Sequence, residues 1–222
     1  MEKDFWLKAW EEGRTRFHNQ QPNTDLLQYF PLFKSQVTEA FVPLCGKSID
    51  MHFLHQAGLE VTGVELSPLA VEQFKHDSKE LGLEWTETEL SQHVLSQTES
   101  LNLYCGDLFE LPAEVLESVD FIYDRAAIVA LPPELRLKYA TWIKETFKQP
   151  HQILLISFEY DQVLCEGPPF SVTEAEIRQL FSDSYTIELL DRRAVDDINP
   201  KFVEANVTKF ERTVYQLKYK AI

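Results

Sequence analysis

The chain has 222 residues, and its 36 acidic and 21 basic side chains give a formal net charge of −15. This length suits one α/β domain, and contents of 44% apolar and 26% charged residues exclude a disordered chain. The negative charge repels phosphate backbones and anionic membranes, so we expect neither nucleic acid nor a membrane as partner. The first residues lack a signal-peptide pattern, and no apolar run reaches the roughly 18 residues of a membrane span. We therefore expect a cytoplasmic monomer that acts on a small molecule.

Three cysteines, Cys45, Cys105 and Cys165, stand sixty residues apart. Their spacing matches neither a disulfide framework nor a zinc site. We therefore predict reduced thiols at strand ends and no metal ligand among them.

The N-terminal segment is rich in aromatic residues. We predict a helix over residues 4–12, because its apolar residues repeat at helical spacing: Phe5, Trp6, Ala9 and Trp10. Phe17 and His18 follow in a loop, and a second helix over residues 24–33 should pack on a sheet. For Trp6, Trp10 and Phe17, two interpretations stay open, core packing or a lid over a site. We expect a single domain over residues 1–222, made of a lid segment over 1–35 and a core over 36–222.

A glycine turn between two predicted strands is the centre of the chain. A strand over residues 39–42 leads into a turn with Gly46, a helix covers 48–57, and a second strand over 60–65 ends in Glu65. This is the pattern of a nucleotide-binding βαβ unit, in which the turn presents backbone N–H groups and the acid binds a ribose. Gly46 and Glu65 are therefore candidate cofactor contacts.

Three interpretations of that turn can be compared from the residues. A phosphate-binding P-loop needs a glycine five positions before Gly46, where Phe41 stands. A dinucleotide fingerprint needs three glycines, and this turn has one. An adenosine cofactor without phosphates fits better, while a tight turn with no ligand is the alternative.

The remaining strands alternate with helices, so we predict an α/β fold with seven strands, mostly parallel, helices on both faces and an antiparallel last strand. The further predicted strands cover residues 101–105, 119–123, 153–158, 185–190 and 213–219, and the further helices cover 68–81, 133–147 and 173–181. Asp107 and Asp124 follow two of these strands, where carboxyl ends open on a crevice. The polar stretch 85–100 has no period, and we expect a surface excursion there.

The chain resembles the thiopurine S-methyltransferase family, in its bacterial branch. The matching segments run almost end to end: residues 5–10 with Gly13 and 17–18, then 42–50, 63–67, 104–112, 123–127 and 167–170. The resemblance implies a Rossmann-like methyltransferase fold and S-adenosyl-L-methionine as cofactor. It implies cofactor contacts at Trp10, Leu44, Glu65, Asp107, Leu108 and Arg125. On the substrate side it implies Phe17, next to which we place Trp6 and Pro169.

The resemblance is looser over residues 196–207. Mammalian members have an arginine at the pocket in this segment, and here the segment offers Lys201 but no arginine. Arginine and lysine present a positive charge to anions differently, so no role is carried over to this segment.

Methyl transfer from a sulfonium is an in-line displacement, so the enzyme chiefly holds the acceptor roughly 3 to 3.5 Å from the methyl carbon and excludes water. Aromatic thiols ionise readily, and Arg125, or a water held by Asp124 or His18, completes the deprotonation. Competing interpretations are backbone pairing for His18 and a salt bridge to Asp124 or Asp107 for Arg125. We expect aromatic and heterocyclic thiols such as thiopurines as acceptors. The alternatives are tellurium or selenium oxyanions, since bacterial relatives are linked to metalloid resistance, or a non-catalytic module that binds S-adenosylmethionine.

Overall fold

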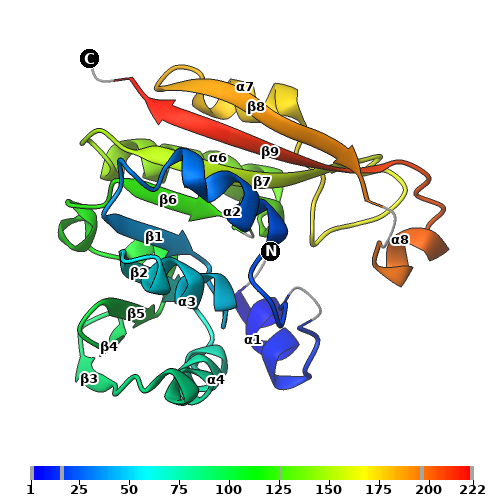
Figure 1. Cartoon of the computed structure of the whole chain (residues 1–222). Coiled ribbons are helices and arrows are strands. Elements are labelled where there is room, and N and C mark those ends of the chain that lie inside the picture. Colours follow the sequence, from blue (N-terminus) through cyan, green and yellow to red (C-terminus); the bar gives the residue numbers. More distant parts are fainter. Residues whose placement is uncertain (1–2, 16–17, 126, 196–197, 221–222) are drawn as a thin grey trace. The chain divides into compact units, whose positions relative to one another are not determined.

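The computed structural model describes residues 3–15, 18–125, 127–195 and 198–220. The chain forms two compact units, Met1–Ile122 and Tyr123–Ile222, and each is described by itself. Figure 1 shows the elements of both units in chain order. None of the helices in the described ranges has the length and apolar run that a membrane crossing requires. The prediction of one domain stays a prediction.

The first unit is a sheet with short helices. Its strands are β1 (Glu39–Pro43), β2 (Glu60–Glu65), β3 (Thr86–Glu89), β4 (Val94–Gln97), β5 (Leu101–Cys105) and the start of β6 (Phe121–Asp124). Its helices are α1 (Lys3–Glu11), α2 (Thr24–Tyr29), α3 (Ile49–Gln56) and α4 (Pro68–Ser78), with 3₁₀ turns η1 (Phe30–Leu32), η2 (Lys79–Leu81), η3 (Leu108–Glu110) and η4 (Ala113–Leu116). The predicted helices over 4–12, 24–33, 48–57 and 68–81 are thereby confirmed.

The strand order in this unit reverses at β1. β1 pairs in parallel with both β2 and β6, and β2 pairs in parallel with β5. The chain therefore moves outward from β1 to β2 and β5, and then returns to the other side of β1 with β6. In open α/β sheets, ligands bind at the carboxyl ends of strands beside such a reversal.

Local signals explain why α4 starts where it does. The Ser67 hydroxyl accepts a hydrogen bond from the N–H of Ala70 at 3.3 Å, and Pro68 occupies the first helical position. A serine cap satisfies an otherwise unpaired N–H, and proline loses nothing there because that N–H has no helical partner. These two residues follow Glu65 by two and three positions, so they also fix the chain that leaves β2.

The prediction of a strandless excursion over residues 85–100 is wrong. β3 and β4 form an antiparallel hairpin, and β4 pairs with the edge of β5 from Val94 opposite Cys105 to Gln97 opposite Asn102. All four residues of β3, Thr-Glu-Thr-Glu, are exposed, so the hairpin carries no apolar alternation for a sequence pattern to detect. It forms because β5 offers an unpaired edge.

The second unit contains three long strands and four helices within its described residues. They are α5 (Ala127–Ala130), α6 (Pro133–Thr146), β7 (Gln152–Tyr160), α7 (Glu174–Phe181), β8 (Tyr185–Ala194), α8 (Pro200–Glu204) and β9 (Phe210–Tyr219). β9 pairs antiparallel with β7 and with β8, which confirms the predicted antiparallel last strand. Over the described chain there are nine strands, so the predicted count of seven is wrong, because the hairpin β3–β4 was missed.

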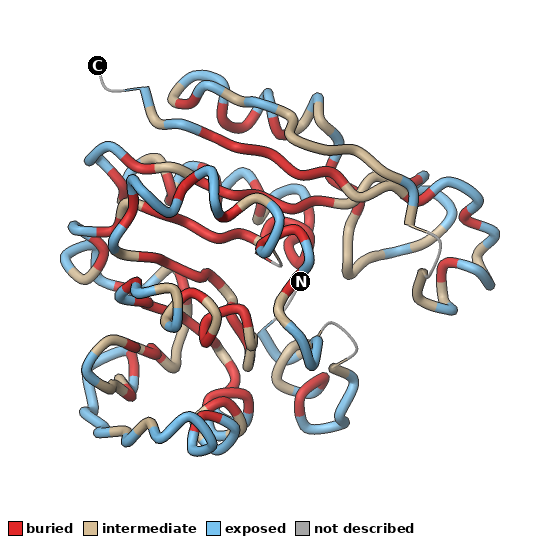
Figure 2. Tube along the Cα trace, viewed as in Figure 1, coloured by how far each residue is buried: buried red, intermediate tan, exposed pale blue. Residues whose placement is uncertain are grey.

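The core follows the strands. Figure 2 shows buried residues running along the central strands, with exposed residues on the loops and outer helix faces. In the first unit, the rings of Phe30 and Phe33 lie 5.7 and 5.0 Å from the ring of Phe121 on β6. The second predicted helix therefore packs on the sheet as expected, and such ring pairs add to the energy of area burial.

Candidate functional site

The turn after β1 has an unusual backbone. Leu44 and Gly46 both have positive φ, 47° and 55°. A non-glycine residue in this region costs about 1 to 3 kcal/mol and is concentrated at functional sites. The N–H of Cys45 donates to the carbonyl of Val64 at 3.0 Å, so β2 holds the turn in this form.

Glu65, the acid that ends β2, joins two turns. Its side chain is buried, one oxygen accepts the N–H of Gly46 at 2.8 Å, and the other accepts the N–H of Ser67 at 2.8 Å. Burial raises the pKa of Glu65, and backbone hydrogen bonds from Ser67, Gly46 and Leu66 oppose that rise. Each carboxylate oxygen has two lone pairs, so Glu65 retains acceptor capacity for the hydroxyls of a ribose.

Trp10 of α1 lies on the glycine turn. Its indole is buried, and the ring atom Cζ2 lies 3.0 Å from where a β-carbon on Gly46 would stand. Gly46 is therefore required both by its positive φ and by the indole. Trp6 is half-buried and packs edge-on against Phe5, with ring centroids 5.3 Å apart. The lid role of α1 stays a prediction.

Asp107 stands two residues beyond the end of β5. One carboxylate oxygen accepts the N–H of Phe109 at 3.0 Å and caps η3, and the other is 2.7 Å from the ammonium of Lys3. The hydrogen bond to Asp107 raises the pKa of Lys3. Leu108 is buried in the first unit.

Lys47 follows Gly46 at the position of a P-loop lysine. Its ammonium lies 3.3 Å from the carboxylate of Asp77 on α4. A P-loop lysine must reach phosphate oxygens, whereas this one is engaged by an acid. The site therefore fits an adenosine cofactor that carries no phosphate. It offers two carboxylates at the ends of neighbouring parallel strands, one glycine and an indole.

The N-terminal loop places His18 in the first unit. Its backbone N–H donates to the carbonyl of Thr15 at 2.8 Å, and its side chain is half-buried. Phe17, predicted on the substrate side, lies outside the described residues. The catalytic role of His18 and the substrate role of Phe17 stay predictions.

Asp124 and Arg125 belong to the second unit. The buried carboxylate of Asp124 accepts the hydroxyl of Tyr139 at 2.9 Å and the N–H of Ile128 at 3.2 Å, and burial raises its pKa to about 6. Within the described part of this unit, Arg125 has no ion-pair partner, so the salt bridge to Asp124 considered from the sequence is not formed.

Pro169 lies in a loop that several side chains hold by its carbonyls. The hydroxyl of Tyr160 donates to the carbonyl of Pro169 at 2.8 Å. The ammonium of Lys201 donates to the carbonyls of Glu166 and Pro168 at 3.0 and 2.5 Å, and burial lowers its pKa. No role was predicted for Lys201, because no local pattern links it to a loop more than thirty residues away. The segment 196–197 next to it lies outside the described residues.

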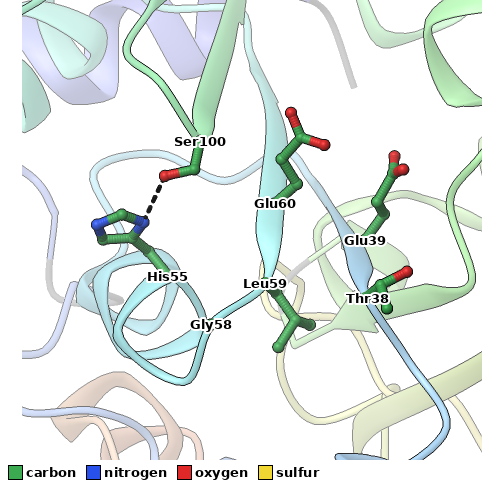
Figure 3. A pocket seen from close by; sticks show the side chains of 7 residues that line it. All are labelled: Thr38, Glu39, His55, Gly58, Leu59, Glu60 and Ser100. Carbon is green, nitrogen blue, oxygen red and sulfur yellow. Dashed lines mark hydrogen bonds between the residues drawn. The ribbon is translucent and has the colours of Figure 1, made fainter.

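A hollow of about 460 Å³ lies at the opposite edge of the first unit's sheet. Figure 3 shows the side chains that line it. The hydroxyl oxygen of Ser100 lies 2.9 Å from Nδ1 of His55. The lining comes from the starts of β1 and β2 and the ends of neighbouring loops: Thr38, Glu39, His55, Gly58, Leu59, Glu60 and Ser100. Ligands of such sheets bind at the carboxyl ends, so this hollow is separate from the turn with Gly46. In the described ranges, no three acids, histidines or cysteines gather as a metal-binding set.

Comparison with known proteins gives a consistent result. The model of the family described as thiopurine S-methyltransferase matches residues 1–220. A protein named thiopurine S-methyltransferase from Bordetella petrii is 40% identical over 219 residues, covering 98% of this chain and 99% of that one. A protein of the same name from Nitrosomonas eutropha is 40% identical over 223 residues, covering all of both chains.

Solved structures agree on the fold. The chain is similar to magnesium protoporphyrin IX methyltransferase from Synechocystis with bound S-adenosylhomocysteine, with a TM-score of 0.66, 13% identity, and coverage of 98% of this chain and 99% of that one. It is also similar to 1,6-didemethyltoxoflavin-N1-methyltransferase from Burkholderia thailandensis, with a TM-score of 0.63, 14% identity, and coverage of 98% and 87%. At these identities, the likeness is one of fold.

Proposed function

The chain belongs to the thiopurine S-methyltransferase family, and we propose that the acceptors of this enzyme are aromatic and heterocyclic thiols such as thiopurines. It is an S-methyltransferase that uses S-adenosyl-L-methionine. One observation carries the cofactor assignment to particular residues. The carboxylate of Glu65, buried and held by the N–H groups of Gly46 and Ser67, stands at the carboxyl end of a central parallel strand.

The chain's own residues supply binding and orientation. When bound, the cofactor supplies an electrophilic methyl group on a positively charged sulfur. We assign Glu65 to the ribose hydroxyls of the cofactor and Asp107 to the exocyclic amine of its base. Trp10 and Leu44 are assigned to the walls of the proposed cofactor site. A carboxylate that is already fixed by backbone N–H groups needs little reorganisation when a ligand binds.

Lys3 competes for the same carboxylate as the exocyclic amine. Its ammonium lies 2.7 Å from Asp107 and is itself exposed. Exposed ion pairs contribute little, typically about 0 to 1 kcal/mol, so a neutral donor that is also stacked and enclosed can displace it. We propose that the N-terminal end of α1, which carries Lys3, moves away from Asp107 when the cofactor binds.

No residue of the turn acts as a covalent nucleophile in this proposal. Cys45 is buried, burial raises its pKa well above the usual range, and its sulfur lies 2.9 Å from where a β-carbon on Gly63 would stand. A thiol must be ionised and accessible to attack. Cys45 is therefore not assigned as a carrier of the methyl group, and the sulfur of the acceptor would be the nucleophile.

Deprotonation and acceptor binding are assigned to groups outside the βαβ unit. Arg125 stabilises the thiolate, and a water held by Asp124, whose pKa is raised to about 6, or by His18 passes the proton of the thiol to that side chain. Trp6, Phe17 and Pro169 offer apolar surface to a flat ring.

Purified enzyme with labelled cofactor tests the proposal. Aromatic thiols, aliphatic thiols, tellurite and selenite are offered in parallel, and methylated products are identified by mass. We expect rapid methylation of aromatic thiols and little of aliphatic ones, since ionised aromatic sulfur needs no strong base. Methylation of an oxyanion but of no thiol would replace the proposed acceptor by a metalloid and would support a role in metalloid resistance.

We also propose that the enzyme works as a cytoplasmic monomer. The net charge of −15 opposes association with nucleic acid and anionic lipid. Light scattering at micromolar concentration should give a mass near the 25.8 kDa of one chain. A mass of twice that value would contradict the monomer.

A further inference from the structure

The hairpin β3–β4 places a histidine against the proposed cofactor site. His93 lies in the hairpin turn, where its carbonyl accepts the N–H of Leu90 at 2.8 Å, and its side chain is buried. Because β4 pairs with β5 in a fixed register, with Val94 opposite Cys105, the turn comes to lie beside the end of β5. Asp107 follows two residues later.

The imidazole explains why residue 106 is glycine. A β-carbon on Gly106 would lie 2.3 Å from Cδ2 of His93 and 2.9 Å from the carbonyl oxygen of Gln92. Gly106 is not among the residues with positive φ, so its backbone conformation does not demand glycine. The close approach of the hairpin demands it.

The same imidazole binds the backbone of the acid. Nε2 of His93 lies 2.9 Å from the carbonyl oxygen of Asp107, and because a carbonyl only accepts, Nε2 carries the proton. On the other side, the N–H of Gly106 donates to the carbonyl of Glu65 at 2.9 Å. The segment that carries Asp107 is thus held between β2 and His93.

We propose that His93 is a positioning residue for cofactor binding, and that the hairpin β3–β4 serves to carry it. By fixing the peptide of Asp107, His93 sets where that carboxylate meets the base of the cofactor. Outer groups that orient a binding residue are often worth tenfold or more in affinity or activity. The inference rests on the proposed assignment of Asp107 to the cofactor.

The test compares two substitutions of one residue. His93→Gln keeps an N–H donor at a similar reach, whereas His93→Leu removes it. We expect His93→Leu to raise the Kd for S-adenosylhomocysteine and the KM for S-adenosylmethionine by roughly three- to tenfold, the size of one lost hydrogen bond. His93→Gln should recover most of that loss, and the KM for the thiol and kcat at saturating cofactor should stay near those of the wild type.

Gly106→Ala gives a second variant if His93→Leu does not fold. Its methyl group pushes the imidazole away while leaving it present, so cofactor affinity should again fall and thiol KM should not. His55→Leu is the matched control. It also removes a histidine hydrogen bond within the first unit, the one to Ser100, but at the amino ends of the strands (Figure 3). It should leave the Kd unchanged.

Three results would overturn the inference. They are wild-type affinity in folded His93→Leu, no recovery in folded His93→Gln, or equal losses in cofactor and thiol constants. Binding of S-adenosylhomocysteine is read by calorimetry without any acceptor. If the wild type binds it but methylates no thiol, the proposed acceptor fails while the test of His93 still stands.

Discussion

In the first unit's sheet, acids stand both at the carboxyl ends of the strands (the carboxyl edge) and at their amino ends (the amino edge). Only the carboxyl edge has the chemistry of a binding site. At the carboxyl edge, Glu65 is buried and accepts two backbone N–H groups. At the amino edge, Glu60 is exposed beside a hollow of about 460 Å³. This hollow thus lies away from the fixed carboxylate. A carboxylate held by backbone donors indicates a binding site better than the size of a depression does.

Removing the N-terminal segment, which is predicted to form a lid, should have the largest effect. Deletion of residues 1–18 removes Trp10 from Gly46 and Lys3 from Asp107, and we expect a folded sheet that no longer transfers methyl groups. The reason is that closing a site excludes water and orients the acceptor. Turnover and circular dichroism are measured together.

The same deletion and a single substitution, Phe17→Ala, together distinguish a lid from ordinary packing. If the segment only packs on the core, the deletion should lower the free energy of unfolding in proportion to the lost area and leave residual turnover. Phe17→Ala should raise the KM for an aromatic thiol more than the KM for the cofactor. Equal changes in both constants would contradict the lid.

The second prediction compares the two edges directly. Glu65→Gln removes the charge with which this side chain is proposed to hold the cofactor ribose, and loss of these charge-assisted hydrogen bonds costs about 1.5 to 3 kcal/mol of binding. Cofactor Kd should therefore rise about 10- to 100-fold at unchanged fold. Glu60→Gln should leave the Kd measured by calorimetry within error of the wild type. An unchanged Kd for Glu65→Gln would remove this acid from the site.

The third prediction concerns α3, which starts at the carboxyl edge and ends at the hollow. Burial lowers the pKa of His52 in this helix to about 4, from an ordinary value of 6.5. The unfolded chain therefore binds a proton between these pH values when the folded chain does not, and stability present above pH 6.5 is lost as pH falls toward 4. We expect this histidine to account for about 1 to 3 kcal/mol of that loss.

Urea unfolding at pH 7 and pH 4.5 measures the effect. In His52→Leu the wild type's acid sensitivity should shrink by that amount, although the lost bond to Ser78 lowers stability at both pH values. The same acid sensitivity in variant and wild type would show that another group titrates.

The smallest effect is expected at Cys45. Cys45→Ser should keep most of the turnover, because the direct transfer to an acceptor sulfur needs no enzyme nucleophile. Steady-state kinetics and cofactor affinity are measured on the folded variant. Loss of turnover with normal cofactor affinity would mean that the Cys45 thiol takes part in the reaction. Glu65 would then not be the only group that distinguishes the carboxyl edge from the amino edge.

Local sequence patterns suffice to predict the βαβ unit and its two ends. Gly46 and Glu65 could be assigned because their signals are local: a glycine after an apolar strand, an acid at the end of the next, and a Ser67–Pro68 helix start. The family resemblance worked for the same reason, since its segments are short runs of adjacent residues.

The contacts between distant residues depend on the tertiary fold and could not be predicted from local patterns. The hairpin over residues 86–97 depends on the free edge of β5, because its own Thr and Glu residues have no apolar period. The contacts of His93 with Gly106, of Lys3 with Asp107, and of Trp10 with Gly46 each join residues from separate elements. Periodicity reports which face of one element is buried, whereas a pair across elements is fixed by strand register and packing, which no local pattern encodes.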